Sequence, residues 1–101
     1  MLRTVFAAAI DAAGRSTHVG DAVGQIQATF ANVRAVLAEA GCAEADIVQA
    51  VAYCKTPEVE AAFREGFGGI GWPFVVAVGD ICRLELVFEI EVTACPGAKR
   101  L

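Results

Sequence analysis

The stretch Leu86-Val87-Phe88-Glu89-Ile90-Glu91-Val92-Thr93 decides the fold, because its side chains alternate between two kinds. The even-numbered residues are large and apolar, whereas the odd-numbered positions include Glu89 and Glu91. Successive side chains of a strand point to opposite faces, so the pattern predicts a strand with one packed face and one acidic face. Charged residues are rarely buried without a partner or a role, which makes this strand the first place to look for a site.

Outward from this strand, turn residues and caps divide the chain into alternating strands and helices. Asp21 is a helix N-cap, and Gly41 ends the helix after an apolar stripe at Val23, Ile26, Phe30, Val33, Leu37 and Ala40. The expected elements are a strand over 4–11, a helix over 21–41, a strand over 47–54, a helix from Pro57 to about Glu65, and strands over 73–79 and 86–95. The glycine-rich segment 66–71 follows a helix, which is the wrong order for a phosphate-binding loop.

The order β-α-β-α-β-β predicts an α+β fold, a mixed sheet with both helices on one face. The segment 47–54 is apolar and free of charge, which suits a central strand covered on both faces. The face with Glu89 and Glu91 must then meet water or a partner. Because 56% of the residues are hydrophobic and only 20% are charged, a partner is favoured. We therefore expect a cyclic oligomer with any site between its subunits.

Composition bounds the class of protein. At 101 residues the chain is expected to form one domain over 1–101, and a net charge of −4 with a pI near 4.8 argues against nucleic acid as a partner. No apolar run reaches the ~18–20 residues that span a bilayer, and the first residues do not resemble a secretory signal. We expect a cytoplasmic protein with no membrane partner.

The four cysteines have no metal-binding spacing, and one histidine cannot complete a zinc site, so neither a metal nor another cofactor is expected. Cys42, Cys54 and Cys95 are expected to act as small buried hydrophobic residues. Cys82 lies in the charged segment Gly79-Asp80-Ile81-Cys82-Arg83 and is a candidate for chemistry.

Three segments resemble the Rid family, also called YjgF or UK114: the helix Gly20–Leu37, the strand start Asp46-Ile47-Val48-Gln49, and Glu89-Ile90-Glu91-Val92. The resemblance implies a homotrimeric enamine/imine deaminase with a chorismate-mutase-like fold. Two departures are visible. From the resemblance we expect the family's usual first strand to be missing from this sequence, and Phe74 follows Pro73 near where the deaminases carry a substrate-binding arginine.

A second likeness, to the catalytic domain of the chorismatases, covers Ser16–Asp21, Gly79–Arg83 and Glu89. Those enzymes cleave or rearrange the enol-ether side chain of chorismate. The resemblance implies that Glu89 is the acid–base residue and that the position of Cys82 helps to select the product. Chorismatases are much longer than this chain, so their N-terminal substrate contacts are not part of it.

These patterns give a set of candidate roles. Glu89 is the expected proton donor, with Glu91 two positions along the same face and able to raise its proton affinity. Arg83 is the candidate anchor for a substrate carboxylate, and Cys82 is a second catalytic candidate. The remaining substrate-binding candidates are His18, which could instead serve its loop or cap the helix, Tyr53, which could instead face a neighbouring subunit, and Phe74, which could instead belong to the core.

Several alternatives stay open at this stage. The two glutamates could line a solvated channel of a trimer or pair with Arg83 or Arg34, and Arg83 could form a surface ion pair with Glu85. The favoured function is a hydrolase or lyase acting on a carboxylated enol ether or enamine. The alternatives are an ordinary Rid imine deaminase and a non-catalytic binding or assembly protein.

Overall fold

The computed structural model describes residues 2–81 and 83–97. Its elements are β1 (Arg3–Ala8), α1 (Ala22–Glu39), the 3-10 turn η1 (Glu44–Asp46), β2 (Ile47–Cys54), α2 (Pro57–Phe67), β3 (Phe74–Val78) and β4 (Phe88–Ala94). The described strands form one sheet in the order β1-β4-β2-β3. β4 is antiparallel to both of its neighbours and β2 is parallel to β3, so the α+β class and the mixed sheet are as predicted.

Local chemistry sets the helix ends. The Asp21 carboxylate accepts a hydrogen bond from the Gly24 N–H at 2.9 Å, which makes Asp21 the N-cap of α1 as predicted. Gly41 follows the helix with a φ of +73°, a backbone conformation that glycine adopts without a steric cost. Thr56 caps α2 in the same way, and Pro57 occupies its first turn. α2 runs two residues beyond the predicted end.

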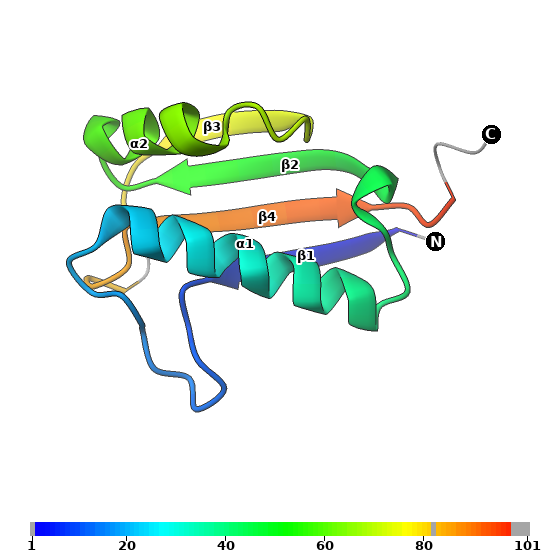
Figure 1. Ribbon diagram of the computed structural model, residues 1–101, viewed down its shortest axis with the longest axis horizontal. Helices are drawn as coiled ribbons and strands as arrows, with labels where there is room; N and C mark the ends of the chain where they lie inside the picture. Colours follow the sequence, from blue (N-terminus) through cyan, green and yellow to red (C-terminus); the bar gives the residue numbers. More distant parts are fainter. Residues whose placement is uncertain (1, 82, 98–101) are drawn as a thin grey trace.

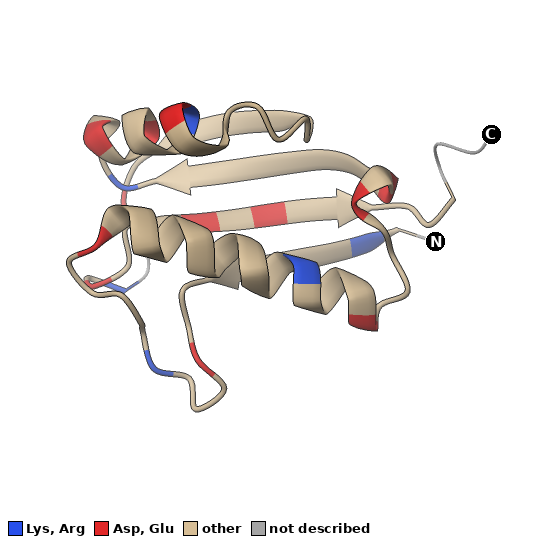
Figure 2. Ribbon diagram, in the orientation of Figure 1, with Lys and Arg blue, Asp and Glu red and all other residues tan. Residues whose placement is uncertain are grey.

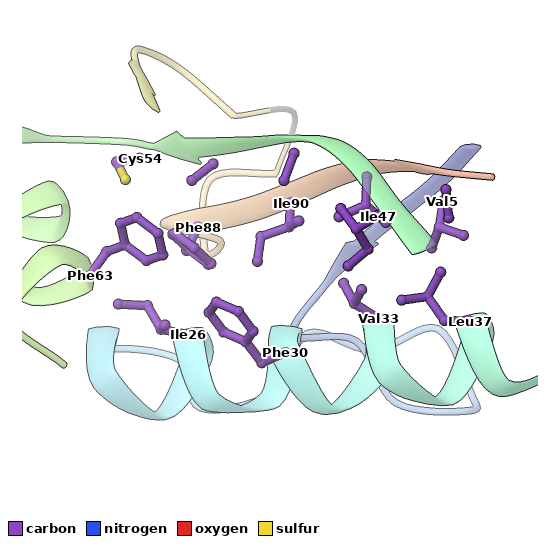
Figure 3. Close-up of a cluster of buried hydrophobic side chains, with 14 of the residues drawn as sticks. Val5, Ile26, Phe30, Val33, Leu37, Ile47, Cys54, Phe63, Phe88 and Ile90 are labelled. Atoms are coloured by element: carbon purple, nitrogen blue, oxygen red, sulfur yellow. The ribbon is translucent and has the colours of Figure 1, made fainter. Parts of the chain in front are cut away.

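Both helices lie on one side of the sheet, α1 across β1 and β4 and α2 beside β2 and β3 (Figure 1). The side chains of Ile26, Phe30 and Val33 point from α1 into the sheet, where they meet Phe88 and Ile90 (Figure 3). All five are at most 1% exposed, so the core occupies the space between α1 and the sheet. The predicted stripe includes one error, because Val23 is half exposed at the start of α1.

None of the described helices lies on the opposite side of the sheet. Paired residues of neighbouring strands share a face, so the registers define this bare face as Thr4, Phe6 and Ala8 of β1, Glu89, Glu91 and Thr93 of β4, Gln49, Val51 and Tyr53 of β2, and Val75 and Ala77 of β3. The prediction that β2 is central is confirmed. The prediction that both of its faces are covered is wrong for the single chain, because Val51 and Tyr53 are only partly buried.

Strand ends differ from the predictions by a few residues. β1 ends at Ala8 rather than Asp11, since the Asp11 carboxylate accepts from the backbone N–H groups of Ala13 and Arg15 and forms a turn. β4 begins at Phe88 rather than Leu86. β1 occupies one edge of the described sheet, and no described strand pairs with its outer side.

Candidate functional site

Glu89 lies at the second position of β4, where strand alternation turns its side chain to the bare face. It is paired in register with Ala8 of β1 and Tyr53 of β2, so it stands in the middle of the sheet. It is nevertheless only 9% exposed. Within the described part of the chain, we find no hydrogen bond or ion pair to its carboxylate.

An aromatic pair lies beside Glu89 on the bare face, since Tyr53 is its register partner on β2. Phe6 comes from β1 and Tyr53 from β2, the two strands that flank β4, and their ring centroids are 5.9 Å apart in a stacked arrangement. The rings therefore lean toward each other across β4. Burial raises the pKa of the Glu89 carboxyl, because a carboxylate loses solvation beside apolar groups. The site thus holds a carboxyl whose neutral form persists to a higher pH than usual.

Glu91 follows two residues later on the same face and is partly buried. Its register partners are Phe6 and Val51, so its neighbours across the sheet are apolar. The two acidic positions interrupt the middle of β4, whereas β2 and β3 carry no charged residue (Figure 2). Arg3 is the charged residue of β1, and its register partner is Ala94 near the far end of the sheet.

The arginines that could have neutralised the glutamates are engaged elsewhere. Arg34 forms an ion pair with Glu44 at 3.1 Å, and its guanidinium lies over the Phe30 and Trp72 rings. Arg83 donates to the Gly14 carbonyl at 2.8 Å and to Ser16 Oγ at 3.3 Å. The alternative in which Arg34 or Arg83 pairs with Glu89 or Glu91 is therefore wrong for the described structure.

Arg83 also forms no direct ion pair with Glu85 in the described structure. Ser16 stands between them: its hydroxyl donates to a Glu85 carboxylate oxygen at 2.9 Å and accepts from Arg83. Bonds from its own backbone N–H and from Ser16 hold the pKa of the Glu85 carboxyl below its ordinary range. This network joins the loop before α1 to the loop between β3 and β4.

The other candidate residues lie in different places. His18 is exposed in the loop before α1 with a φ of +53°, and its carbonyl accepts from the N-cap Asp21 N–H at 2.9 Å. Phe74 points to the helix-covered side, where its ring packs against Phe30, Phe63 and Trp72. The prediction for Cys82 falls outside the described residues. The fold thus brings Glu89, Glu91 and Tyr53 together on the bare face and puts Phe74 on the other face.

Two residues that the sequence reasoning missed belong to this region. Phe6 was not considered, although its alternation with Val5 and Ala7 in the first strand could have indicated an aromatic side chain on the acidic face. Gln25 is fully buried and hydrogen-bonded to the segment before β4. The sequence around Gln25 does not predict this role, because its hydrogen-bond partner Glu85 lies 60 residues further along the chain.

Metal and cysteine predictions can also be compared with the structure. No group of three or more metal-ligating side chains occurs within residues 2–81 and 83–97. Cys42 and Cys54 are buried as predicted, but Cys95 is only partly buried because it follows the end of β4. None of the described helices is both long enough and apolar enough to cross a membrane.

Solved structures supply the comparison with known proteins, since no protein-family model and no curated protein sequence matches this chain. A Rid protein family member from Yersinia pestis is 31% identical with a TM-score of 0.75, and the match covers 92% of this chain and 78% of that one. A protein titled YJGH is 27% identical with a TM-score of 0.72 over 94% of this chain and 77% of that one.

A more distant structure shares the fold. It is a member of the YjgF/YER057c/UK114 family from Mycobacterium tuberculosis, 20% identical with a TM-score of 0.67 over 92% of this chain and 77% of that one. The identity and coverage of the Yersinia pestis match, together with the mixed sheet and its two helices, lead to one conclusion. This chain belongs to the Rid protein family.

Proposed function

We propose that this chain is a Rid-fold hydrolase or lyase that acts on a carboxylated enol ether or enamine, with Glu89 as the general acid, at a site between the subunits of a cytoplasmic homotrimer. One observation carries the proposal. Glu89 is 9% exposed on a face that none of the described helices covers, and burial raises its pKa without a described cationic partner. A carboxyl in this state keeps its proton closer to neutral pH, as a general acid requires.

The chemistry follows from the electron distribution of the substrate. In an enol ether or enamine the terminal carbon is electron-rich, so it takes the proton of the Glu89 carboxyl. The bond from that proton to carbon forms as the Glu89 O–H bond breaks, which leaves an oxocarbenium or iminium ion and a carboxylate. Water then adds to the cation and gives its proton to the carboxylate. Collapse of the adduct releases an alcohol from the enol ether or ammonia from the enamine.

The inter-subunit location is supported by the apolar surface around Glu89. Phe6 is 57% exposed and Val75 is 58% exposed on the bare face of the single chain. Covering such residues with other copies of the chain removes apolar surface from water, a stabilisation of about 25 cal/mol per Å². It also excludes water from Glu89. A substrate bound at the rim of this interface would meet Tyr53 and Glu91 on the same face.

Arg83 is the proposed anchor for the substrate carboxylate, with His18 in the neighbouring loop. The present bonds of Arg83 go to a neutral carbonyl and a hydroxyl, both on exposed groups. If Arg83 exchanged these two hydrogen bonds for a bidentate contact with a substrate carboxylate, it would gain two charge-assisted hydrogen bonds. Cys82 precedes Arg83 in the chain and keeps its predicted role in product selection.

The alternative function is the imine deaminase activity that the Rid resemblance implies, and membership of the family favours it. The same proton transfer from Glu89 would serve it. Release of ammonia from enzymatically generated 2-aminoacrylate, with a loss in Arg83→Ala, would favour this alternative. Absence of both turnover and binding with chorismate and with imines would favour a non-catalytic binding or assembly protein.

The decisive experiment compares the wild type with Glu89→Gln, using Glu58→Gln on the exposed first turn of α2 as the matched control. We expect Glu89→Gln to lose about 10²–10⁴-fold in turnover of the enol ether or enamine, because an amide cannot supply the proton. Glu58→Gln should match the wild type, and size-exclusion chromatography should show the same assembly for all three proteins. Undiminished turnover in Glu89→Gln would rule out the proposed role.

A further inference from the structure

We propose that Gln25 is a positioning residue, which fixes the start of β4 and thereby places Glu89 beside the Phe6–Tyr53 ring pair; its importance for turnover rests on the proposed function. Gln25 lies in the first turn of α1, on the helix-covered side, and is fully buried. A buried amide that lacks hydrogen-bond partners is costly, so its contacts identify what it holds.

The Gln25 side chain uses both ends of its amide. Its Oε1 accepts from the Val87 N–H at 2.8 Å, and its Nε2 donates to the Glu85 carbonyl at 2.8 Å. Nε2 also has a longer contact of 3.4 Å with the Thr17 carbonyl. The carbonyl of one residue and the N–H two residues later are the groups that an extended strand offers to a single neighbour. The amide therefore pairs with segment 85–87 as a peptide group of a neighbouring strand would.

This pairing occurs where β1 no longer supports β4. The β1–β4 register begins on the β4 side at Glu89, opposite Ala8, so the residues just before Glu89 have no strand partner from β1. The Val87 carbonyl accepts from the Lys55 N–H at 2.9 Å, and Lys55 Nζ donates to the Leu84 carbonyl at 2.9 Å. Gln25 accepts from the Val87 N–H and donates to the Glu85 carbonyl, so the backbone of segment 85–87 is bonded to α1 as well as to Lys55.

The position of Val87 bears directly on Glu89. Two residues of extended chain separate them by about 7 Å, so Val87 is the nearest residue before Glu89 whose side chain shares its face. The Phe6–Tyr53 ring pair comes from β1 and β2. The position of β4 along these two strands therefore decides where the Glu89 carboxyl lies relative to the rings. Misplacement of a reacting group by about 1 Å can cost on the order of 100-fold in rate.

The same amide links the two candidate loops. Glu85, whose carbonyl Gln25 holds, accepts from Ser16 through its carboxylate, and Ser16 in turn accepts from Arg83. Arg83 also donates to the Gly14 carbonyl. Gln25 thus supports the loop that carries the proposed anchor as well as the strand that carries the proposed acid. The titratable groups that face Glu89 are Glu91 on β4 and Tyr53 on β2, whereas its β1 partner is Ala8.

The test uses Gln25→Met, which keeps the length of the side chain and removes both hydrogen bonds. Gln27→Met is the control, because Gln27 lies two positions along the same helix and is exposed. The readout is the titration of the Glu89 carboxyl, followed by the side-chain ¹³C shift in NMR. We expect Gln25→Met to move the pKa of Glu89 toward the ordinary glutamate value while Gln27→Met leaves it unchanged. An unchanged Glu89 titration in folded Gln25→Met would overturn the proposal.

Two further measurements keep the test decisive. If Gln25→Met does not fold, Gln25→Glu is used, because a protonated carboxyl can make both bonds. The Glu89 side-chain ¹³C shift of Gln25→Glu should match the wild type in acid and depart from it once the introduced carboxyl ionises. In the wild type, the Val87 amide should exchange with solvent as slowly as the β4 amides, and exchange as fast as in exposed loops would refute the anchoring. These readouts need no substrate, so failure of the proposed function and failure of the Gln25 role give different results. With an active substrate, Gln25→Met should lower kcat about 10–100-fold with a smaller change in KM.

Discussion

On the helix-covered face of the sheet, Phe88 and Ile90 are fully buried, whereas on the bare face of the same strands Phe6 is 57% exposed and Val75 is 58% exposed. The first face is packed within one chain along β1, β4 and β2, because α1 and α2 remove most of its apolar side chains from water, whereas Val78 at the end of β3 stays 48% exposed. The second combines exposed apolar residues with two carboxylates. The difference shows that the covered face stabilises the fold, and it supports our proposal that the bare face is a contact surface.

The largest expected effect is the loss of stability when a side chain of the covered face is truncated. Phe30 contacts the rings of Phe63, Phe67, Trp72, Phe74 and Phe88. Phe30→Ala should lower the free energy of unfolding by about 3–5 kcal/mol, measured by urea denaturation, because the cavity cannot collapse among so many neighbours. Phe6→Ala on the bare face should cost less than about 1 kcal/mol in the isolated chain. Equal losses would contradict the division between the faces.

The second-largest expected effect is on the alkylation rate of the cysteine thiols. Cys54 points to the covered face, and burial raises the pKa of its thiol to about 11, against 9.0 for an unperturbed thiol. At pH 8 its thiolate is therefore about a hundredfold scarcer than that of an ordinary thiol, and alkylation should be slower by at least that factor. Site-resolved mass spectrometry should show Cys95, which is partly buried, reacting before Cys54. Labelling of Cys54 at the rate of Cys95 would show that the covered face opens readily.

Assembly tests the bare face. Val75 and Glu91 are both register partners of Val51, one on each side of β2. Val75→Asp would therefore add a third carboxylate to the surface that we propose is buried between subunits. We expect dissociation to become at least tenfold more favourable, measured by sedimentation at several concentrations, since a charge is costly to bury in an apolar interface. Val36→Asp is the control, because Val36 is exposed on α1. The same dissociation in both variants, or in neither, would remove this face as the interface.

The smallest predicted effect concerns the pH dependence of stability. The pKa of Glu89 is raised in the folded state, so the folded chain binds more protons than the unfolded chain between the two pKa values. Stability contributed by this group is present below the unfolded-state pKa and is lost as the pH rises through the folded-state pKa. Glu89→Gln should therefore be more stable than the wild type at pH 7, and the difference should vanish in acid. Calorimetry at pH 4 and pH 7 measures it, and a variant that is less stable at pH 7 would contradict the burial argument.

Part of the candidate site could be predicted from the sequence and part could not. The alternation around Glu89 placed both glutamates on one face, because the side-chain period of a strand follows from its backbone geometry. The neighbours of Glu89 could not be predicted in this way. Phe6, Tyr53 and Glu89 come from three strands, and the sequence carries no signal for the register that aligns them. The same limit applies to Gln25, whose hydrogen bonds cross about 60 residues of chain.

The sequence by itself determined the kind and order of the elements, the caps at Asp21 and Thr56, and the division of β4 into an apolar and an acidic face. Each of these depends on side chains within a few residues of one another, where local backbone geometry governs the outcome. Only the tertiary structure decided that Arg34 and Arg83 pair away from the glutamates, that Phe74 packs with the core, and that an aromatic pair lies beside Glu89. Those outcomes depend on which distant segments the folded chain brings into contact, and local sequence patterns do not specify such contacts.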